Sequence, residues 1–161
     1  MIRVAVLTIS DSCAAGTRPD ASGPAVADLC AAQGWTVACR ETLPDDAPVI
    51  SRRLAALAGA VDVILTTGGT GIAARDVTPE ATRAVLEKEL PGLAELMRSE
   101  GLRHTRRAVL SRAVAGTRGQ CLLVNLPGSP RGAVQSLNAI LDVVPHIVEL
   151  LRGSTAHREG S

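Results

Sequence analysis

Apolar runs of strand length alternate with segments of helical periodicity along this chain. Residues 2–9, 35–41, 61–66 and 120–125 carry short apolar runs that predict strands. Apolar stripes, with prolines near their starts and glycines near their ends, predict helices over residues 24–33, 47–58, 79–89, 93–101 and 130–144. Pro145 should interrupt the last helix before a final apolar segment at 146–151.

The alternation of strands and helices predicts an α/β fold. We expect three layers, with a mostly parallel sheet covered by helices on both faces. Residues 102–119 fit this alternation least well and predict a short helix followed by a hairpin. Residues 1–152 should form a single domain, and the polar residues 153–161 should form a disordered tail.

The amino-acid composition and net charge of the chain exclude some classes of binding partner. A chain of 161 residues, 46% hydrophobic and 20% charged, is long enough to bury a core. A net charge of +1 and a single aromatic residue, Trp35, argue against nucleic acids and anionic membranes as ligands. The four cysteines form no C-x-x-C pair, and no apolar run reaches membrane-spanning length. We therefore expect free thiols and a cytoplasmic location.

The stretch from residue 62 to residue 82 contains the strongest candidate chemistry. A buried strand is followed at once by Thr67, Gly68, Gly69, Thr70 and Gly71. Glycines at a strand end allow positive φ, so that backbone N–H groups can converge on an anion, and the threonines add hydroxyls. This loop predicts a phosphate site. The alternative is a tight strand-to-helix turn without a ligand.

Asp76 lies between the glycine loop and the next predicted helix. Pro79 is expected as the first residue of that helix, with Thr78 as its N-cap. A carboxylate beside a phosphate site suggests a divalent cation that bridges the two, such as Mg²⁺. A second helix cap is the alternative role for Asp76.

Unusual residues follow the predicted strands at four places. Parallel strands bring the loops at their carboxyl ends to one edge of the sheet, where ligands bind in folds of this class. We therefore expect these loops to meet: Ser10-Asp11, Asp45-Asp46, Gly68 to Asp76, and Pro127-Gly128-Ser129.

Structural explanations compete with these functional ones. Asp45 and Asp46 precede a helix and could simply favour its positive end, by about 0.3–1 kcal/mol each. Ser111 could be a plain turn residue. Three arginines near the loops could bind phosphate, although exposed arginines are common and this signal is weak: Arg75, Arg112 and Arg131.

Several catalytic classes lack their motifs. The glycine loop is not followed by Lys-Ser/Thr, so it is not a Walker A loop, and it is not Gly-x-Gly-x-x-Gly. No Gly-x-Ser-x-Gly elbow of a hydrolase is present. The three histidines are scattered and expected at the surface, which argues against a transition-metal site: His104, His146 and His157.

Taken together, the motifs resemble those of the molybdopterin adenylyltransferase family, the MogA/MoaB-like proteins related to the G domain of gephyrin. The resemblance runs from about residue 3 to residue 151. It is carried by Thr8-Ile-Ser-Asp11, Asp20-x-Ser-Gly-Pro24, Pro44-Asp45, Thr67-Gly-Gly-Thr-Gly71, Asp76-Val-Thr-Pro-Glu-Ala-Thr82, Pro91-Gly92 with Met97-Arg98, Leu110-Ser-Arg112, Ala115-Gly116 and Asn125-Leu-Pro-Gly-Ser-Pro130.

This resemblance implies a reaction in molybdenum cofactor biosynthesis. Mg²⁺-ATP would adenylylate molybdopterin and release pyrophosphate, which prepares the pterin for metal insertion by a downstream protein. By position, Asp45 and Asp76 match the family's essential acids, and we expect them to hold Mg²⁺ against the triphosphate. The loop from Gly68 to Gly71 matches the family's phosphate-binding loop, and Ser111 matches a serine linked to molybdopterin. Pro127 to Ser129 would line the same pocket, and we expect Ser10 and Asp11 to bind substrate or nucleotide there.

The resemblance also implies a homotrimer, and the last helix has more apolar residues than one stripe needs. A non-catalytic trimer that binds or carries molybdopterin, as in the MoaB-like branch, is the alternative function. A scaffold for protein partners has no sequence feature of its own here.

Overall fold

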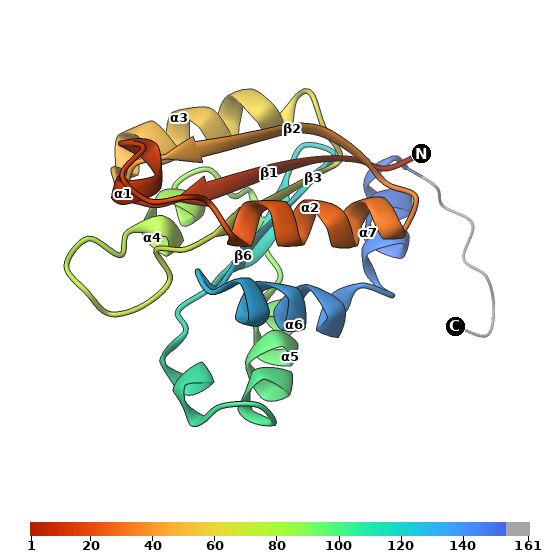
Figure 1. The fold of residues 1–161 in the computed structure, drawn as a ribbon. Helices are drawn as coiled ribbons and strands as arrows, with labels where there is room; N and C mark the ends of the chain where they lie inside the picture. The colour runs from red at the N-terminus through yellow and green to blue at the C-terminus, as the bar shows by residue number, and fades with distance from the viewer. Residues whose placement is uncertain (154–161) are drawn as a thin grey trace.

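The structure is a computed structural model, and it describes residues 1–153. Of the predicted tail, residues 154–161 therefore lie outside the described residues. Six strands form one sheet in the order β2-β1-β3-β6-β5-β4 (Figure 1). Their bounds are β1 (Arg3–Ile9), β2 (Thr36–Leu43), β3 (Val63–Thr67), β4 (Lys88–Glu89), β5 (Ala115–Arg118) and β6 (Cys121–Leu126).

Five strands run in the same direction, and β5 runs against them. β1 pairs in parallel with β2 and β3, and β3 pairs in parallel with β6. β5 runs antiparallel to both β6 and β4, so the hairpin predicted after the short helix is confirmed. The parallel half of the sheet brings the ends of β1, β2, β3 and β6 to the same edge.

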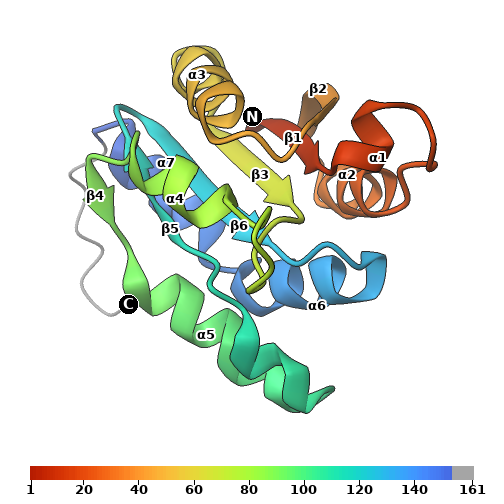
Figure 2. The ribbon, with the colours of Figure 1, turned by 90° about the vertical axis from the view of Figure 1, so that its left-hand side faces the viewer.

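Helices cover both faces of the sheet, as the sequence predicts. α2, α5, α6 and α7 pack on one face, and α3 and α4 pack on the other (Figure 2). Their bounds are α1 (Asp11–Ala14), α2 (Ser22–Ala32), α3 (Ala47–Ala58), α4 (Thr78–Arg83), α5 (Pro91–Leu102), α6 (Pro130–Ile140) and α7 (Val144–Leu151), with the 3₁₀ helix η1 (Arg106–Leu110).

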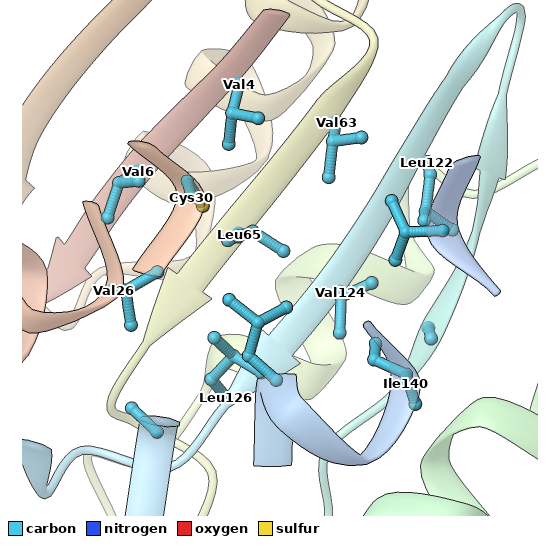
Figure 3. Packing of buried hydrophobic residues seen from close by; sticks show 14 of the residues in the cluster. Val4, Val6, Val26, Cys30, Val63, Leu65, Leu122, Val124, Leu126 and Ile140 are labelled. Atoms are coloured by element: carbon cyan, nitrogen blue, oxygen red, sulfur yellow. The ribbon is translucent and has the colours of Figure 1, made fainter. Parts of the chain in front are cut away.

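The core is aliphatic because strands covered on both faces need apolar side chains on every position. Val63, Ile64 and Leu65 of β3 are all fully buried, and they alternate between the two faces. On the α2–α6 face, Leu65 lies among Val6, Val124 and other branched side chains (Figure 3). This continuous packing holds the strand ends, and therefore the loops after them, in place.

Two short elements were not predicted. Residues after Ser10 form the helix α1, which Ser10 caps by accepting a hydrogen bond from the Cys13 N–H at 3.3 Å, where a loop was expected. The helix predicted over 79–89 begins at Thr78 and ends at Arg83, and β4 follows it. The chain turns there because the N–H groups of Glu87 and Leu90 bond to carbonyls of Thr117 and Ala115 in β5.

The prediction of Thr78 as an N-cap is wrong. Val77 holds the cap position of α4, and no side chain caps this helix. The Thr78 N–H donates instead to the Gly69 carbonyl at 3.2 Å, which draws Thr78 against the glycine loop.

The last helical segment breaks earlier than predicted. α6 ends at Ile140, and Pro145 lies in the first turn of α7, a position that proline tolerates. Among the described residues, no single helix is long and apolar enough to cross a membrane, although α6 and α7 together reach that length and composition with a bend of 63° between them.

Replacing Leu65 with alanine should lower the free energy of unfolding by about 2–5 kcal/mol, because its fully buried side chain lies on the central strand. Urea denaturation measures this change. Leu150→Ala is the control, since Leu150 is 53% exposed, and should change stability by less than about 0.5 kcal/mol. Equal losses in the two variants would contradict this description of the core.

Candidate active site

The predicted convergence of four loops is confirmed by the sheet. β1, β2, β3 and β6 are neighbours and parallel, so the loops after Ile9, Leu43, Thr67 and Leu126 leave from one edge. Tight packing joins two of these loops. Gly68 has a φ of 92°, and a Cβ there would collide with the Ile9 carbonyl and approach Gly128 Cα at 3.9 Å. Only glycine fits this position.

A cavity of about 320 Å³ opens on one side of this junction, and we call it the Ser111 cavity. It extends between α5, η1 and the start of α6, and Ala94, Met97 and Leu110 give it an apolar wall. Arg98 donates to the Ala113 carbonyl at 3.1 Å and so orders the chain beside Ser111. Five of the predicted site residues line this cavity: Thr70, Gly71, Ser111, Pro127 and Ser129.

A second cavity of about 280 Å³ lies on the other side, and we call it the Asp20 cavity. Asp20 accepts hydrogen bonds from the Thr8 hydroxyl at 2.8 Å and from the Gly23 N–H at 3.0 Å. Five predicted site residues line it: Ser10, Thr67, Gly68, Gly128 and Ser129. Ser129 is the only predicted site residue that lines both cavities, so the two lie next to each other.

Three of the predicted site residues are acids that line neither cavity: Asp11, Asp45 and Asp76. Asp11 and Asp45 hold each other in place, because each carboxylate accepts the backbone N–H of the other at 3.0 Å. A Cβ added to Gly69 would lie 3.2 Å from Asp45 Oδ1, and one added to Gly71 would lie 2.8 Å from Asp76 Oδ2. Asp45 and Asp76 therefore approach the same short segment of backbone.

Electrostatics distinguish Asp45 from Asp11. Arg75 donates two hydrogen bonds to Asp11, at 2.6 and 2.9 Å, and holds the pKa of that carboxyl below its usual value. Burial raises the pKa of Asp45, and the negative charges of Asp11 and Asp76 raise it further. The surrounding protein thus compensates the charge of Asp45 less well than that of Asp11.

Arg112 organises the loop that carries Asp76, a role that sequence reasoning did not foresee. Its backbone N–H donates to the Thr70 carbonyl at 2.9 Å, and its guanidinium donates to the carbonyls of Gly71 and Asp76, both at 2.7 Å. It also pairs with Glu80. These bonds join the start of the loop, at Thr70 and Gly71, and its end, at Asp76, to Arg112 and so to its neighbour Ser111. The only sign of this role in the sequence was the place of Arg112 in the Leu110-Ser-Arg112 motif.

The two adjacent acids Asp45 and Asp46 differ in their structural role. Asp46 caps α3 by accepting the Val49 N–H at 3.2 Å, so its structural role is confirmed. Asp45 does not cap that helix. Asp76 accepts the Ala73 N–H at 2.9 Å, which shapes the loop through one oxygen only.

The acids fit a divalent cation that is completed by a substrate. Within residues 1–153, no group of three or more His, Cys, Asp or Glu side chains could hold a metal ion by itself. Mg²⁺ is usually held by one or two carboxylates together with phosphates and water. Asp45 Oδ1 accepts no hydrogen bond from the described residues, and the nearby Arg75 forms its ion pair with Asp11. This donor set suits Mg²⁺ with a nucleotide.

Comparison with known proteins identifies the family. The model of a family described as "Probable molybdopterin binding domain" matches residues 5–146. The chain belongs to this molybdopterin-binding family. The chain is similar to a protein named molybdopterin adenylyltransferase from Helicobacter pylori, 37% identical over 95% of this chain and 89% of that protein's length. A protein of the same name from Escherichia coli is 36% identical over 94% of this chain and 86% of its own length.

Solved structures of the family share the fold. The molybdopterin biosynthesis enzyme MoaB from Thermus thermophilus is 51% identical and superposes with a TM-score of 0.89, covering 95% of this chain and 98% of its own. The tungsten cofactor synthesizing protein MoaB from Pyrococcus furiosus is 35% identical, with a TM-score of 0.84 and coverage of 94% and 98%. The predicted resemblance and the predicted three-layer α/β fold are thus confirmed.

Replacing Asp45 with asparagine should raise the thermal midpoint at pH 7. The amide oxygen can still accept the Asp11 N–H, while the poorly compensated charge is removed. Because the pKa of Asp45 is raised by folding, its carboxylate destabilises the folded state above that pKa and has no such effect once it is protonated. The rise in midpoint should therefore become smaller as the pH falls through the pKa of Asp45. Thermal melts of the variant and of the unmodified protein over a series of pH values from 7 downward measure this change.

Asp46→Asn is the matched control for this experiment. Asparagine caps helices as well as aspartate but lacks the charge that favours the positive end of α3, so Asp46→Asn should leave the midpoint at pH 7 the same or slightly lower, never higher. A lower midpoint for Asp45→Asn at pH 7 would show that the Asp45 carboxylate stabilises the fold.

Proposed function

We propose that this protein is a molybdopterin adenylyltransferase acting in molybdenum cofactor biosynthesis. It would transfer AMP from ATP to the terminal phosphate of molybdopterin and release pyrophosphate. The observation that carries the proposal is the pair of adjacent cavities that share Ser129 at the glycine loop. Two substrates whose phosphates must meet need such an arrangement. The names of the Helicobacter pylori and Escherichia coli relatives support the same reaction.

The two cavities suggest how the substrates divide. Ser111 matches the family serine linked to molybdopterin, so we assign the pterin to the Ser111 cavity. Its apolar wall, with Met97 and Leu110, suits a flat heterocycle. The Asp20 cavity then remains for the adenosine part of ATP, and its hydroxyls and carboxylate offer partners for a ribose. The phosphates of both substrates would meet between Gly68 and Ser129.

In this arrangement the protein acts mainly by positioning. An oxygen of the molybdopterin phosphate attacks the α-phosphorus of ATP, and the bond from that phosphorus to the departing pyrophosphate breaks. Backbone N–H groups of Gly69 to Gly71 are placed to hold phosphate oxygens, because both Gly68 and Gly69 have positive φ. Holding both phosphates in line accounts for much of the rate in reactions of this type.

Asp45 and Asp76 are the residues that would hold Mg²⁺. The ion would supply positive charge against the triphosphate when it is bound. Asp11 keeps Asp45 oriented through the paired backbone bonds, and Arg75 restrains Asp11. Arg112 holds the Asp76 loop against the Ser111 cavity. A pterin carrier would have no use for the poorly compensated charge of Asp45, and this favours catalysis over the carrier function.

Replacing Asp76 with asparagine should lower the rate of adenylylation by about 100-fold or more, because a carboxylate ligand of the metal is lost. Purified protein, molybdopterin, ATP and Mg²⁺ are incubated, and the adenylylated pterin is detected. Asp46→Asn is the control and should retain activity, since Asp46 only caps α3. A rate for Asp76→Asn close to that of the unmodified protein would count against this role. Pterin bound but never adenylylated by the unmodified protein would favour the carrier.

We also propose that the protein is a homotrimer in the cytoplasm and passes its product to a metal-insertion protein, as the resemblance implies. The apolar residues of α6 and α7 do not support the trimer, because four of them are buried within the subunit: Leu137, Ile140, Val144 and Val148. Sedimentation velocity should give a mass three times that of the 16.6 kDa chain. A monomer at micromolar concentration would contradict the proposed trimer.

A further inference from the structure

One buried hydroxyl has no partner in this structure, and it lies against the glycine loop. Thr78 is fully buried, and its Oγ1 is the only buried side-chain nitrogen or oxygen among residues 1–153 that makes no hydrogen bond. Buried polar groups are almost always paired, because an unpaired one loses its hydration without compensation. An exception of this kind calls for an explanation.

The neighbouring threonines show that the fold can satisfy such hydroxyls. Thr82 lies one turn further along α4, donates to the Thr78 carbonyl at 2.8 Å and accepts from Asn125 Nδ2 at 2.9 Å. Thr66 accepts from the same amide group at 3.1 Å. Thr78 takes part through its backbone, with its N–H bonded to the Gly69 carbonyl and its carbonyl bonded to Thr82, yet its hydroxyl makes no hydrogen bond. The missing bond is therefore local to one side chain.

The Thr78 hydroxyl is directed at the place where the acids meet the glycine loop. A Cβ on Gly69 would collide with Thr78 Oγ1 and would lie 3.2 Å from Asp45 Oδ1. Both oxygens thus approach one point beside Gly69, and neither accepts or donates a hydrogen bond within the described residues. Asp76 precedes Thr78 by two residues on the same loop. The three side chains offer hard oxygen atoms, the ligands that Mg²⁺ prefers.

We propose that Thr78 Oγ1 is a third protein oxygen in the coordination of the divalent cation, beside Asp45 and Asp76. It would reach the metal directly or through one of the waters that Mg²⁺ retains. This inference rests on the proposed function, since it assumes a metal-bound nucleotide at the glycine loop. A neutral hydroxyl adds a ligand without adding to the negative charge that already raises the pKa of Asp45. Phosphate-binding loops of other nucleotide enzymes use a Ser or Thr hydroxyl on Mg²⁺ in this way.

The test separates metal binding from stability. Calorimetry measures the affinity for an ATP analogue with a methylene between the α- and β-phosphorus atoms, once with Mg²⁺ and once with EDTA. Thr78→Val keeps the shape of the side chain and removes the hydroxyl. Its affinity with Mg²⁺ should fall about tenfold, as expected for a lost bond to a charged group, while its affinity in EDTA stays unchanged. Thr78→Ser keeps the hydroxyl and should bind the analogue as the unmodified protein does.

Thermal melts without ligand supply the matched control. Thr78→Val should melt at the same temperature as the unmodified protein or higher, because the hydroxyl that it loses has no partner. Thr82→Val should melt lower, because its hydroxyl is bonded on both sides. A lower midpoint for Thr78→Val, an unchanged affinity with Mg²⁺, or an equal loss with Mg²⁺ and with EDTA would each overturn the assignment. If the unmodified protein binds the analogue without any dependence on Mg²⁺, the proposed function itself fails.

Discussion

The close approach of Gly68 to its neighbours is the constraint on which the site depends. At the end of β3, the Gly68 backbone lies against the Ile9 carbonyl and near Gly128 Cα, so that a side chain at position 68 would push the glycine loop away from the end of β1. This contact lies where the two cavities meet, and Ser129 follows it directly. The parallel strands bring the loops to one edge of the sheet, and the absence of a side chain at Gly68 allows them to touch. The phosphate site that we propose for the two substrates would depend on that contact.

The site keeps interactions that a structure selected for stability alone would avoid. Burial and the charges of Asp11 and Asp76 raise the pKa of the Asp45 carboxyl, and the Thr78 hydroxyl is buried without a partner. Elsewhere the fold satisfies its polar groups, as Asn125 does by joining β3, α4 and the Val114 N–H. The two exceptions lie beside the same glycine, Gly69. Such concentration of unfavourable features at one point is typical of a binding site that its ligand completes.

The sequence predicted the main elements because their signals are local. α3 has the predicted bounds, 47–58, since Asp46, Pro48 and an apolar stripe define it within a few residues. α4 and β4 were mispredicted because their ends depend on hydrogen bonds to β5, some 30 residues away in the chain. The same holds for Thr78. Its residue type suits an N-cap, but a backbone bond to Gly69 directs the side chain elsewhere.

By itself, the sequence determined the fold class, the family resemblance and the set of loops that carry the site. Those properties follow from periodicity and from motifs that are contiguous in the chain. Only the tertiary structure decided that the predicted site residues divide between two cavities, that Arg112 holds the Asp76 loop, and that Asp45 rather than Asp46 faces the glycines. These outcomes depend on which side chains meet across the strand order β2-β1-β3-β6, where residues distant in sequence become neighbours.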